Sequence, residues 1–265
     1  MNLLRACSAL CWVSFRRLLW SSGTLMILLP LGLTIAELSI LGHRYALDKN
    51  FGRAFEQFSR EFVIFQFALL VIPLCALTYA TTSIGGDRED RTLLFLLVRP
   101  VPRPLIVVAK IFATLPLVLG LIIGVFYVDC RLAGAAGVAA FDAYLPAVLA
   151  MSVSYVAAFH LFAVLFRHAT VLALIYSIFM EFFLSNIPGM VQRFAVNFYG
   201  RSMIYDYGTS LLQVRGESRV VEPLDPRVFT GVTAETALWA MLGISATAIV
   251  LAMIVFQRKE YRDLT

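Results

Sequence analysis

Hydrophobic residues along the chain form long runs that are nearly free of charge, and short clusters of charged residues separate these runs. An α-helix of about 20 apolar residues spans the roughly 30 Å hydrocarbon core of a bilayer. The pattern therefore predicts an all-α, polytopic integral membrane protein with about six transmembrane helices. In chain order the predicted spans are about Thr24–Leu41, Phe62–Thr82, Ile106–Val128, Tyr144–Phe166, Thr170–Leu184 and Ala237–Phe256.

The segments outside the spans have patterns of their own. Residues 1–20 place apolar side chains at helical spacing with the arginines off that stripe, which predicts an interfacial helix lying along the membrane. Segment 185–235 carries two apolar stripes, which predict two short amphipathic helices before the last span, and 213–229 then looks like exposed loop. A charged loop is expected at 43–61, and a segment of small residues at 132–140 separates two spans.

Composition supports this membrane architecture. The chain is 60% hydrophobic and 15% charged, whereas soluble domains are near 45–50% apolar and 25% charged. Six spans and their loops use the whole sequence, so we expect a single transmembrane domain over residues 1–265. The net charge of +5 comes from Lys and Arg at helix ends and in loops, where lipid headgroups explain them, so nucleic acid is not expected as a partner. The four cysteines and three histidines have no ligand-like spacing, so no metal site is expected.

The distribution of Lys and Arg predicts the orientation. With six spans both termini lie on one side, and 12 of the 22 basic residues lie on that side. Half of the remaining ten fall in the long 185–235 segment, where they weigh less. We therefore expect both termini in the cytoplasm, segment 84–105 as the main cytoplasmic loop, and segment 185–235 outside the cytoplasm.

The sequence contains no nucleotide-binding, serine-hydrolase or zinc-protease motif, so catalysis by this chain is not expected. Three ionisable residues lie inside the predicted spans, namely Glu37, His160 and Glu181. A charge near the bilayer centre costs about 2.5–3.5 kcal/mol, so such residues usually face a protein interior or water. For each of the three, a contact in a transport pathway and a packing or interfacial role both remain open.

One charged cluster stands out on the expected cytoplasmic side. Residues 87–92 are densely charged, and the six apolar residues 93–98 that follow are too few to span a membrane. This pattern predicts a short helix beside the membrane, stopped by Arg99-Pro100. It fits either a solvated loop with an interfacial anchor or a docking element for a soluble protein.

The stretch from Arg88 to Arg103, with Lys110 beyond it, resembles the signature of ABC-2 type transporter permeases. That signature has a charged cluster, Gly-Thr-Leu, a short leucine-rich helix, Pro-Val-Ser-Arg and a later Lys. This chain differs by Arg91 in place of the Gly and Pro102 in place of the Ser. The order of elements is also similar, with an interfacial helix, six spans and this loop between the second and third spans.

The resemblance implies a permease subunit of an ATP-binding cassette transporter in the cytoplasmic (inner) membrane, directed toward export. It implies a homo- or heterodimer of permease chains bound to separate ATPase subunits. ATP and Mg would be held by those subunits, and this chain would bind no cofactor itself. The implied ATPase contact consists of Asp87, Arg88, Glu89, Asp90, Arg91, Thr92, Leu93, Leu94, Leu97, Arg99, Pro100 and Arg103.

Two other classes of function fit the same hydrophobic pattern. One is an ion-coupled secondary carrier that uses Glu37, His160 or Glu181, although we find no repeat with matched broken helices, which would favour a carrier. The other is a non-transporting scaffold that recruits a cytoplasmic protein through segment 84–105. The apolar spans fit a lipid, drug, peptide or polymer substrate equally well.

Overall fold

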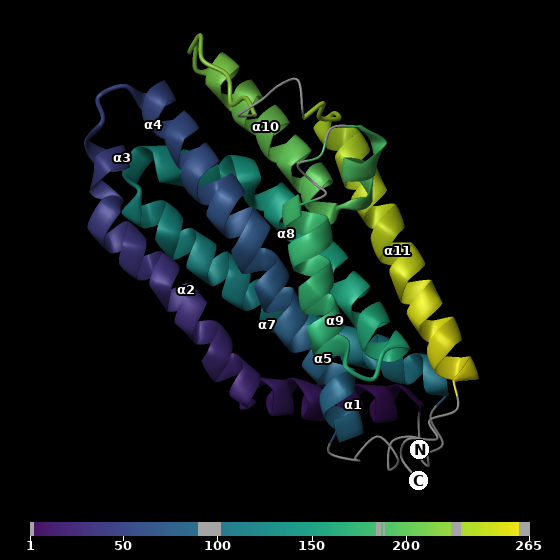
Figure 1. The fold of residues 1–265 in the computed structure, drawn as a ribbon. Coiled ribbons are helices and arrows are strands. Elements are labelled where there is room, and N and C mark those ends of the chain that lie inside the picture. Colours follow the sequence, from purple (N-terminus) through teal and green to yellow (C-terminus); the bar gives the residue numbers. More distant parts are fainter. Residues whose placement is uncertain (1–2, 90–101, 184–186, 188, 224–228, 260–265) are drawn as a thin grey trace.

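The computed structural model of the chain describes residues 3–89, 102–183, 187, 189–223 and 229–259. These residues form helices and connecting segments and contain no strand, and Figure 1 shows the long helices side by side. The helices in chain order are α1 (Leu3–Leu19), α2 (Ser22–Leu41), α3 (His43–Leu47), α4 (Phe51–Phe58), η1 (Ser59–Val71), α5 (Ile72–Glu89), α7 (Arg103–Leu132), α8 (Gly134–Leu165), α9 (Ala169–Tyr176), η2 (Ser177–Phe183), η4 (Met190–Phe194), α10 (Val196–Val214) and α11 (Ala234–Arg258).

Five helical stretches of the described chain are long and apolar enough to cross a membrane, which confirms the predicted all-α, multi-pass architecture. The fifth predicted span is shorter. It forms an apolar helix over Ala169–Glu181, whose axial rise is roughly 20 Å, less than the thickness of the hydrocarbon core. The five long stretches are Ser22–Leu47, Phe51–Arg88, Arg103–Leu132, Gly134–Leu165 and Ala234–Arg258.

The predicted interfacial helix forms as α1, which lies crosswise at one end of the bundle (Figure 1). Its residue Leu18 is buried against the bundle, whereas the Trp12 side chain is exposed. The hydroxyls of Ser21 and Thr24 both donate to the Leu18 carbonyl, at 2.8 and 2.7 Å. These bonds satisfy a carbonyl that the end of a helix leaves without an internal partner, and they set the corner into α2.

The second span is a continuous helical rod made of α4, η1 and α5, so the charged loop expected at 43–61 is wrong. The segment is helical because its apolar residues share one face, and Phe55 and Phe58 are completely buried there while the charged side chains lie opposite. The Asn50 side chain caps α4 by accepting from the Arg53 backbone N–H at 3.0 Å. The middle of the rod, η1, is π-helical.

Helices α7 and α8 form a hairpin whose corner is Gly134, with a φ of +73°. This corner lies inside the small-residue segment at 132–140, and most of the segment forms the first turns of α8. The small side chains of Ala136 and Ala140 are buried there and allow close packing. Helix α8 contacts α5, α7, α10 and α11, so it is the central helix of the bundle.

The two short helices predicted in segment 185–235 form as one 3₁₀ turn, η4, and one long helix, α10. Gly200 does not break α10, because it is a packing position, and a Cβ atom there would lie within 2.2 Å of the Met151 sulfur. The exposed loop predicted at 213–229 is partly wrong, since Val221 and Phe229 are buried. Helix α11 ends at the same end of the bundle as α1 (Figure 1).

We call the end that carries α1, the last turn of α5 and the first turn of α7 the α1 end. The opposite end, with α4 and the last turn of α10, is the α4 end (Figure 1).

Candidate functional site

A buried carboxylate lies at the α1 end, directly before the signature segment. Asp87, in the last turn of α5, is 2% exposed. Its Oδ1 atom accepts from the Arg17 guanidinium of α1, and its Oδ2 atom pairs with the Lys110 ammonium of α7. The Lys110 side chain is buried, whereas the Arg17 side chain is 40% exposed. One carboxylate therefore joins three helices that are far apart in the sequence.

The neighbouring residue Arg88 points into the bundle as well. It is 7% exposed, and its Nη1 atom donates to the Phe166 carbonyl at 2.9 Å. Lys259, just after α11, donates to the carbonyls of Val164 and Leu165 at 3.0 and 2.7 Å. The last carbonyls of a helix have no internal partners and carry partial negative charge, so both cations stabilise the end of α8.

Four of the twelve predicted contact residues lie among the described residues. Asp87 and Arg88 are buried in the bundle, Glu89 is the last residue of α5, and Arg103 is exposed at the start of α7. Two of the described contact residues, Asp87 and Arg88, thus face the interior of the bundle, and Arg103 is exposed. The other predicted contact residues lie outside the described residues: Asp90, Arg91, Thr92, Leu93, Leu94, Leu97, Arg99 and Pro100.

Glu181 stabilises the start of a helix. It lies in η2, is 1% exposed, and accepts the backbone N–H groups of Val196 and Asn197 at 3.2 and 2.9 Å. These are the first two residues of α10, whose N–H groups have no partners within the helix. A carboxylate is favoured there by the helix dipole, so these contacts give Glu181 a role in helix packing.

Glu37 and His160 also have partners within the chain. Glu37 accepts from the Gln66 side-chain amide at 2.6 Å, a bond that joins α2 to η1. His160 is completely buried in α8, and its Nδ1 atom donates to the Val156 carbonyl at 2.8 Å. Each of the three candidates inside the spans therefore lies among its own set of neighbours.

Comparison with protein families matches residues 16–261, nearly the whole chain, to the ABC-2 family transporter protein family. The chain belongs to the ABC-2 transporter family. No curated protein matches it. The match confirms the resemblance that was carried by the signature between Arg88 and Arg103.

Membership of the ABC-2 family supports a permease component of an ABC transporter, and it implies association with an ABC ATPase subunit. Members are transmembrane subunits that are typically not catalytic, in agreement with the lack of a nucleotide-binding motif in the sequence. The multi-pass membrane location is supported by the same match together with the five apolar helices.

Sequence reasoning missed one buried acid of this ABC-2 permease. Asp129 seemed to mark the end of the third span, but α7 continues to Leu132 and Asp129 is completely buried. Its Oδ2 atom lies 3.1 Å from the Thr34 hydroxyl of α2. The sequence contained a signal that the helix continues past Asp129. The next residue is Cys130, a residue type that is usually buried, and Arg131 comes only after it.

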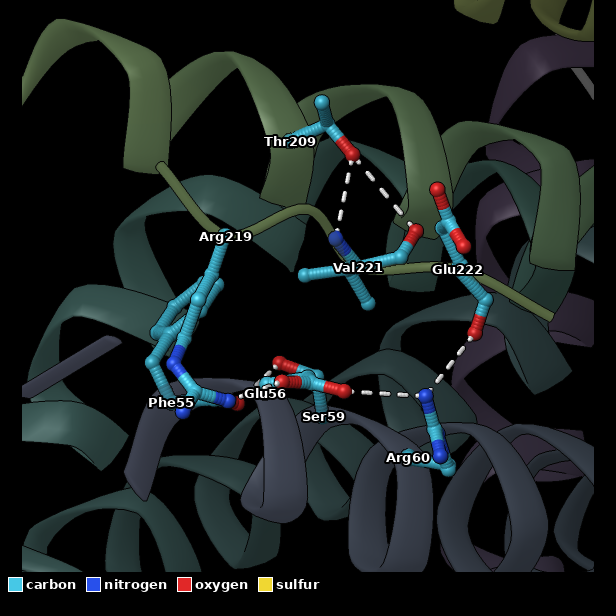
Figure 2. Close-up of polar contacts among 8 residues, drawn as sticks. All are labelled: Phe55, Glu56, Ser59, Arg60, Thr209, Arg219, Val221 and Glu222. Carbon is cyan, nitrogen blue, oxygen red and sulfur yellow. Dashed lines mark hydrogen bonds and ion pairs between the residues drawn. The ribbon is translucent and has the colours of Figure 1, made fainter. Parts of the chain in front are cut away.

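The α4 end of the permease has a second cluster of charges (Figure 2). The segment after α10 lies over α4, and Arg219 pairs with Glu56 at 3.1 Å. Glu56 also pairs with Arg60 at 2.9 Å, and Arg60 donates to the Glu222 carbonyl at 3.4 Å. The backbone N–H of Val221 donates to the Thr209 hydroxyl at 3.2 Å. These contacts hold residues 215–223 as a strap across the end of the bundle.

Proposed function

We propose that this chain is the membrane-spanning permease subunit of an ATP-driven exporter, and that a separate ATPase subunit docks at the α1 end. The observation that carries the proposal is the burial of Asp87 and Arg88 where the signature segment begins. Their contacts join α5 to α1, to α7 and to the turn after α8. A partner that moves segment 90–101 would thus act on four elements of the bundle at once.

The physical basis of this coupling is the cost of separating buried charges. Breaking a buried ion pair leaves an uncompensated charge and is strongly unfavourable. The end of α5 and the start of α7 therefore move together with α1 rather than sliding past it. The apolar contacts beside them act in the same direction, since Ile84, Ile106 and Phe256 are buried in one cluster. Motion imposed at the α1 end is passed into the spans.

In this proposal the predicted contact residues divide into two groups. Asp87 and Arg88 are positioning residues that hold the segment, while the other ten predicted contact residues, from Glu89 to Arg103, provide the surface for the partner. The partner binds ATP and Mg, and this chain binds neither. Two permease chains and two ATPase chains form the transporter, as the family resemblance implies. Lys and Arg are more frequent on the side of the inner membrane that carries both termini. This bias supports a cytoplasmic location for that side and for the ATPase.

Co-purification of the ATPase with a tagged permease, solubilised in mild detergent from its native host, tests the proposal. Arg103→Glu should reduce the amount of ATPase recovered about tenfold, because charge reversal at an interface opposes docking. Arg131→Glu is the matched control. Both arginines are exposed and lie on α7, but at opposite ends. Arg131→Glu should leave recovery unchanged.

The same preparation separates the rival functions. If no ATPase accompanies the wild-type chain, the proposal fails. If an ATPase is recovered but its rate of ATP hydrolysis in proteoliposomes does not depend on the permease, the chain is a scaffold. Coupling predicts that Asp87→Asn lowers this hydrolysis rate at unchanged ATPase recovery, because the contact surface remains while the link to α1 and α7 is weakened.

A further inference from the structure

A polar cavity of about 350 Å³ lies at the α1 end, beside the corner between α1 and α2. It is bounded by α1, the start of α2, the last turns of α5 and one residue of α7. The side chains that matter for its chemistry are Arg17, Trp20, Ser83, Asp87 and Lys110. Cavities of this size are large enough for a small ligand.

The ionised side chains that line the cavity favour an anion. Arg17 stands at its exposed side, with 40% of the side chain accessible, and Lys110 lies deeper, with 5% accessible. Asp87 lies between them and pairs with both. Two cations and one carboxylate leave one positive charge among these lining residues. Guanidinium and ammonium groups are the side chains that bind phosphate oxygens most strongly.

A free hydroxyl group points to the same ligand chemistry. Thr78, Thr81 and Thr82 each donate their hydroxyl hydrogen to the carbonyl four residues earlier in α5. Ser83 lies on the same helix, is 2% exposed and lines the cavity, but its Oγ atom has no hydrogen-bond partner in the described part of the chain. A buried hydroxyl without a partner is costly, and an oxygen-bearing ligand would satisfy it.

The surroundings of the cavity are those of a membrane interface. Trp20, the residue directly after α1, lines the cavity and is 84% exposed, and Trp12, on α1, is 65% exposed. Exposed tryptophans are typical of the headgroup level of a bilayer. Leu25 and Met26, one turn into α2, are exposed apolar residues that suit lipid chains. The cavity therefore lies at the depth of lipid phosphates.

We infer that this cavity binds a phosphate group, with the Arg17 guanidinium, the Lys110 ammonium and the Ser83 hydroxyl as donors. The ligand is a phosphate-bearing anion, and its two sources are an anionic lipid headgroup and free phosphate. Binding joins α1 to α5 and α7 through the ligand, in addition to Asp87. The inference concerns lipid or anion binding, so it holds independently of the ATPase partner.

A titration of the purified full chain in neutral detergent tests the inference. The chain has three tryptophans, and Trp12→Phe with Trp239→Phe leaves Trp20 as the only indole beside the cavity. Dioctanoyl phosphatidylglycerol, dioctanoyl phosphatidylcholine and sodium phosphate are the three probes. We expect phosphatidylglycerol to change the Trp20 emission with a saturable midpoint, and phosphatidylcholine to need a much higher concentration.

Matched variants then locate the binding site. Arg17→Gln should raise the midpoint about tenfold or more, since it removes a charge-assisted donor. Arg16→Gln removes the same charge from an exposed position of the same helix outside the cavity, and it should change the midpoint less than about twofold. Ser83→Ala removes one hydroxyl without touching an ion pair and should raise the midpoint a few-fold.

The outcomes separate the alternatives. Saturation by sodium phosphate alone supports the phosphate site and assigns it to a free anion, whereas saturation by phosphatidylglycerol alone assigns it to a lipid. Equal effects of Arg16→Gln and Arg17→Gln would mean general surface electrostatics and overturn the inference. It is also overturned if phosphatidylglycerol produces no saturable change, or if Ser83→Ala and Arg17→Gln both leave the midpoint of a folded protein unchanged.

Discussion

At the scale of single residues, Asp87 is the most demanding position in the bundle. A carboxylate that is 2% exposed loses most of its hydration, and it is tolerated because Arg17 and Lys110 provide opposite charges. The two cations differ in exposure. The Arg17 charge would remain hydrated by solvent if its pair with Asp87 were lost. The buried Lys110 charge would not. The stability of the α1 end therefore depends mainly on the pair of Asp87 with Lys110.

A pair of substitutions tests this dependence. Asp87→Asn keeps the shape of the side chain but leaves the buried Lys110 ammonium without a counter-charge, so we expect a loss of about 3 kcal/mol in the free energy of unfolding. Adding Lys110→Met removes the unpaired charge and should restore most of the loss. Denaturant unfolding in detergent measures both. A double variant no more stable than Asp87→Asn alone would contradict the argument.

The half-exposed pair at the α4 end provides the comparison (Figure 2). Glu56 and Arg219 retain more hydration than Asp87 and Lys110, with side chains 19% and 43% exposed. Solvated pairs contribute little to stability. Glu56→Gln should therefore lower the free energy of unfolding by less than about 1 kcal/mol.

Glu181 differs from Asp87 because two of its partners are backbone N–H groups. Glu181→Ala leaves the N–H groups of Val196 and Asn197 buried without acceptors, at a cost of about 2 kcal/mol. Glu181→Gln keeps one acceptor oxygen and should lose about half as much. Hydrogen exchange at the start of α10 measures the change. A variant that is fully stable but inactive in transport would instead indicate a substrate contact.

Sequence reasoning found Glu181 but not its role, and the reason is physical. A charge inside an apolar run is visible in one sequence, so Glu37, His160 and Glu181 could all be singled out. Their partners lie on other helices or on the backbone, and hydrophobic spacing does not show which backbone groups lack acceptors. In the same way, Lys110 was visible, but its pairing with Asp87 depends on how α5 and α7 pack.

At the scale of helices, the boundaries are where prediction and structure differ most. Mean hydropathy averages over all faces of a helix, so the amphipathic segment 43–61 looked like a loop although Phe55 and Phe58 are buried. Two short helices were predicted in segment 185–235, whereas α10 runs unbroken through Gly200. Glycine weakens a helix in isolation, but here it allows close packing against Met151. Long, uniformly apolar runs were located correctly because a span is apolar on every face, including the faces that are exposed on the bundle.

The corner between α7 and α8 offers a test at this scale. Gly134 has a φ of +73°, and a Cβ atom there would lie 2.9 Å from the Ala46 side chain. Gly134→Ala should therefore cost about 2 kcal/mol through backbone strain and crowding. Gly120→Ala is the matched control, since Gly120 is inside α7 with no atom within 4 Å of the added carbon. It should be neutral or slightly stabilising, and equal losses in the two variants would contradict the assignment of strain to the corner.

At the scale of the whole molecule, the permease has two chemically distinct ends. The α1 end has the crosswise helix, the buried ion pairs and the helix ends that flank the signature segment. The α4 end has the strap of residues 215–223, tied down by half-exposed ion pairs and one hydroxyl (Figure 2). Among the described residues, the ion pairs of the α1 end are thus more deeply buried than those of the α4 end. A tightly paired end and a lightly held strap fit the proposal that an ATPase drives this subunit from the α1 end.

This assignment requires that the α1 end face the cytoplasm, and labelling of single cysteines in intact cells tests it. Arg103 and Arg258 are exposed at the α1 end, and Ser218 is exposed on the strap. With the four native cysteines replaced, Ser218→Cys should react with a membrane-impermeant maleimide in intact cells. Arg103→Cys and Arg258→Cys should react only after permeabilisation. The reverse pattern would place the strap in the cytoplasm and the α1 end outside it. An ATPase docked at the α1 end would then have no access to cytoplasmic ATP. Reaction of Arg103→Cys and Arg258→Cys from opposite sides would contradict the packing of α1 and α11 at one end.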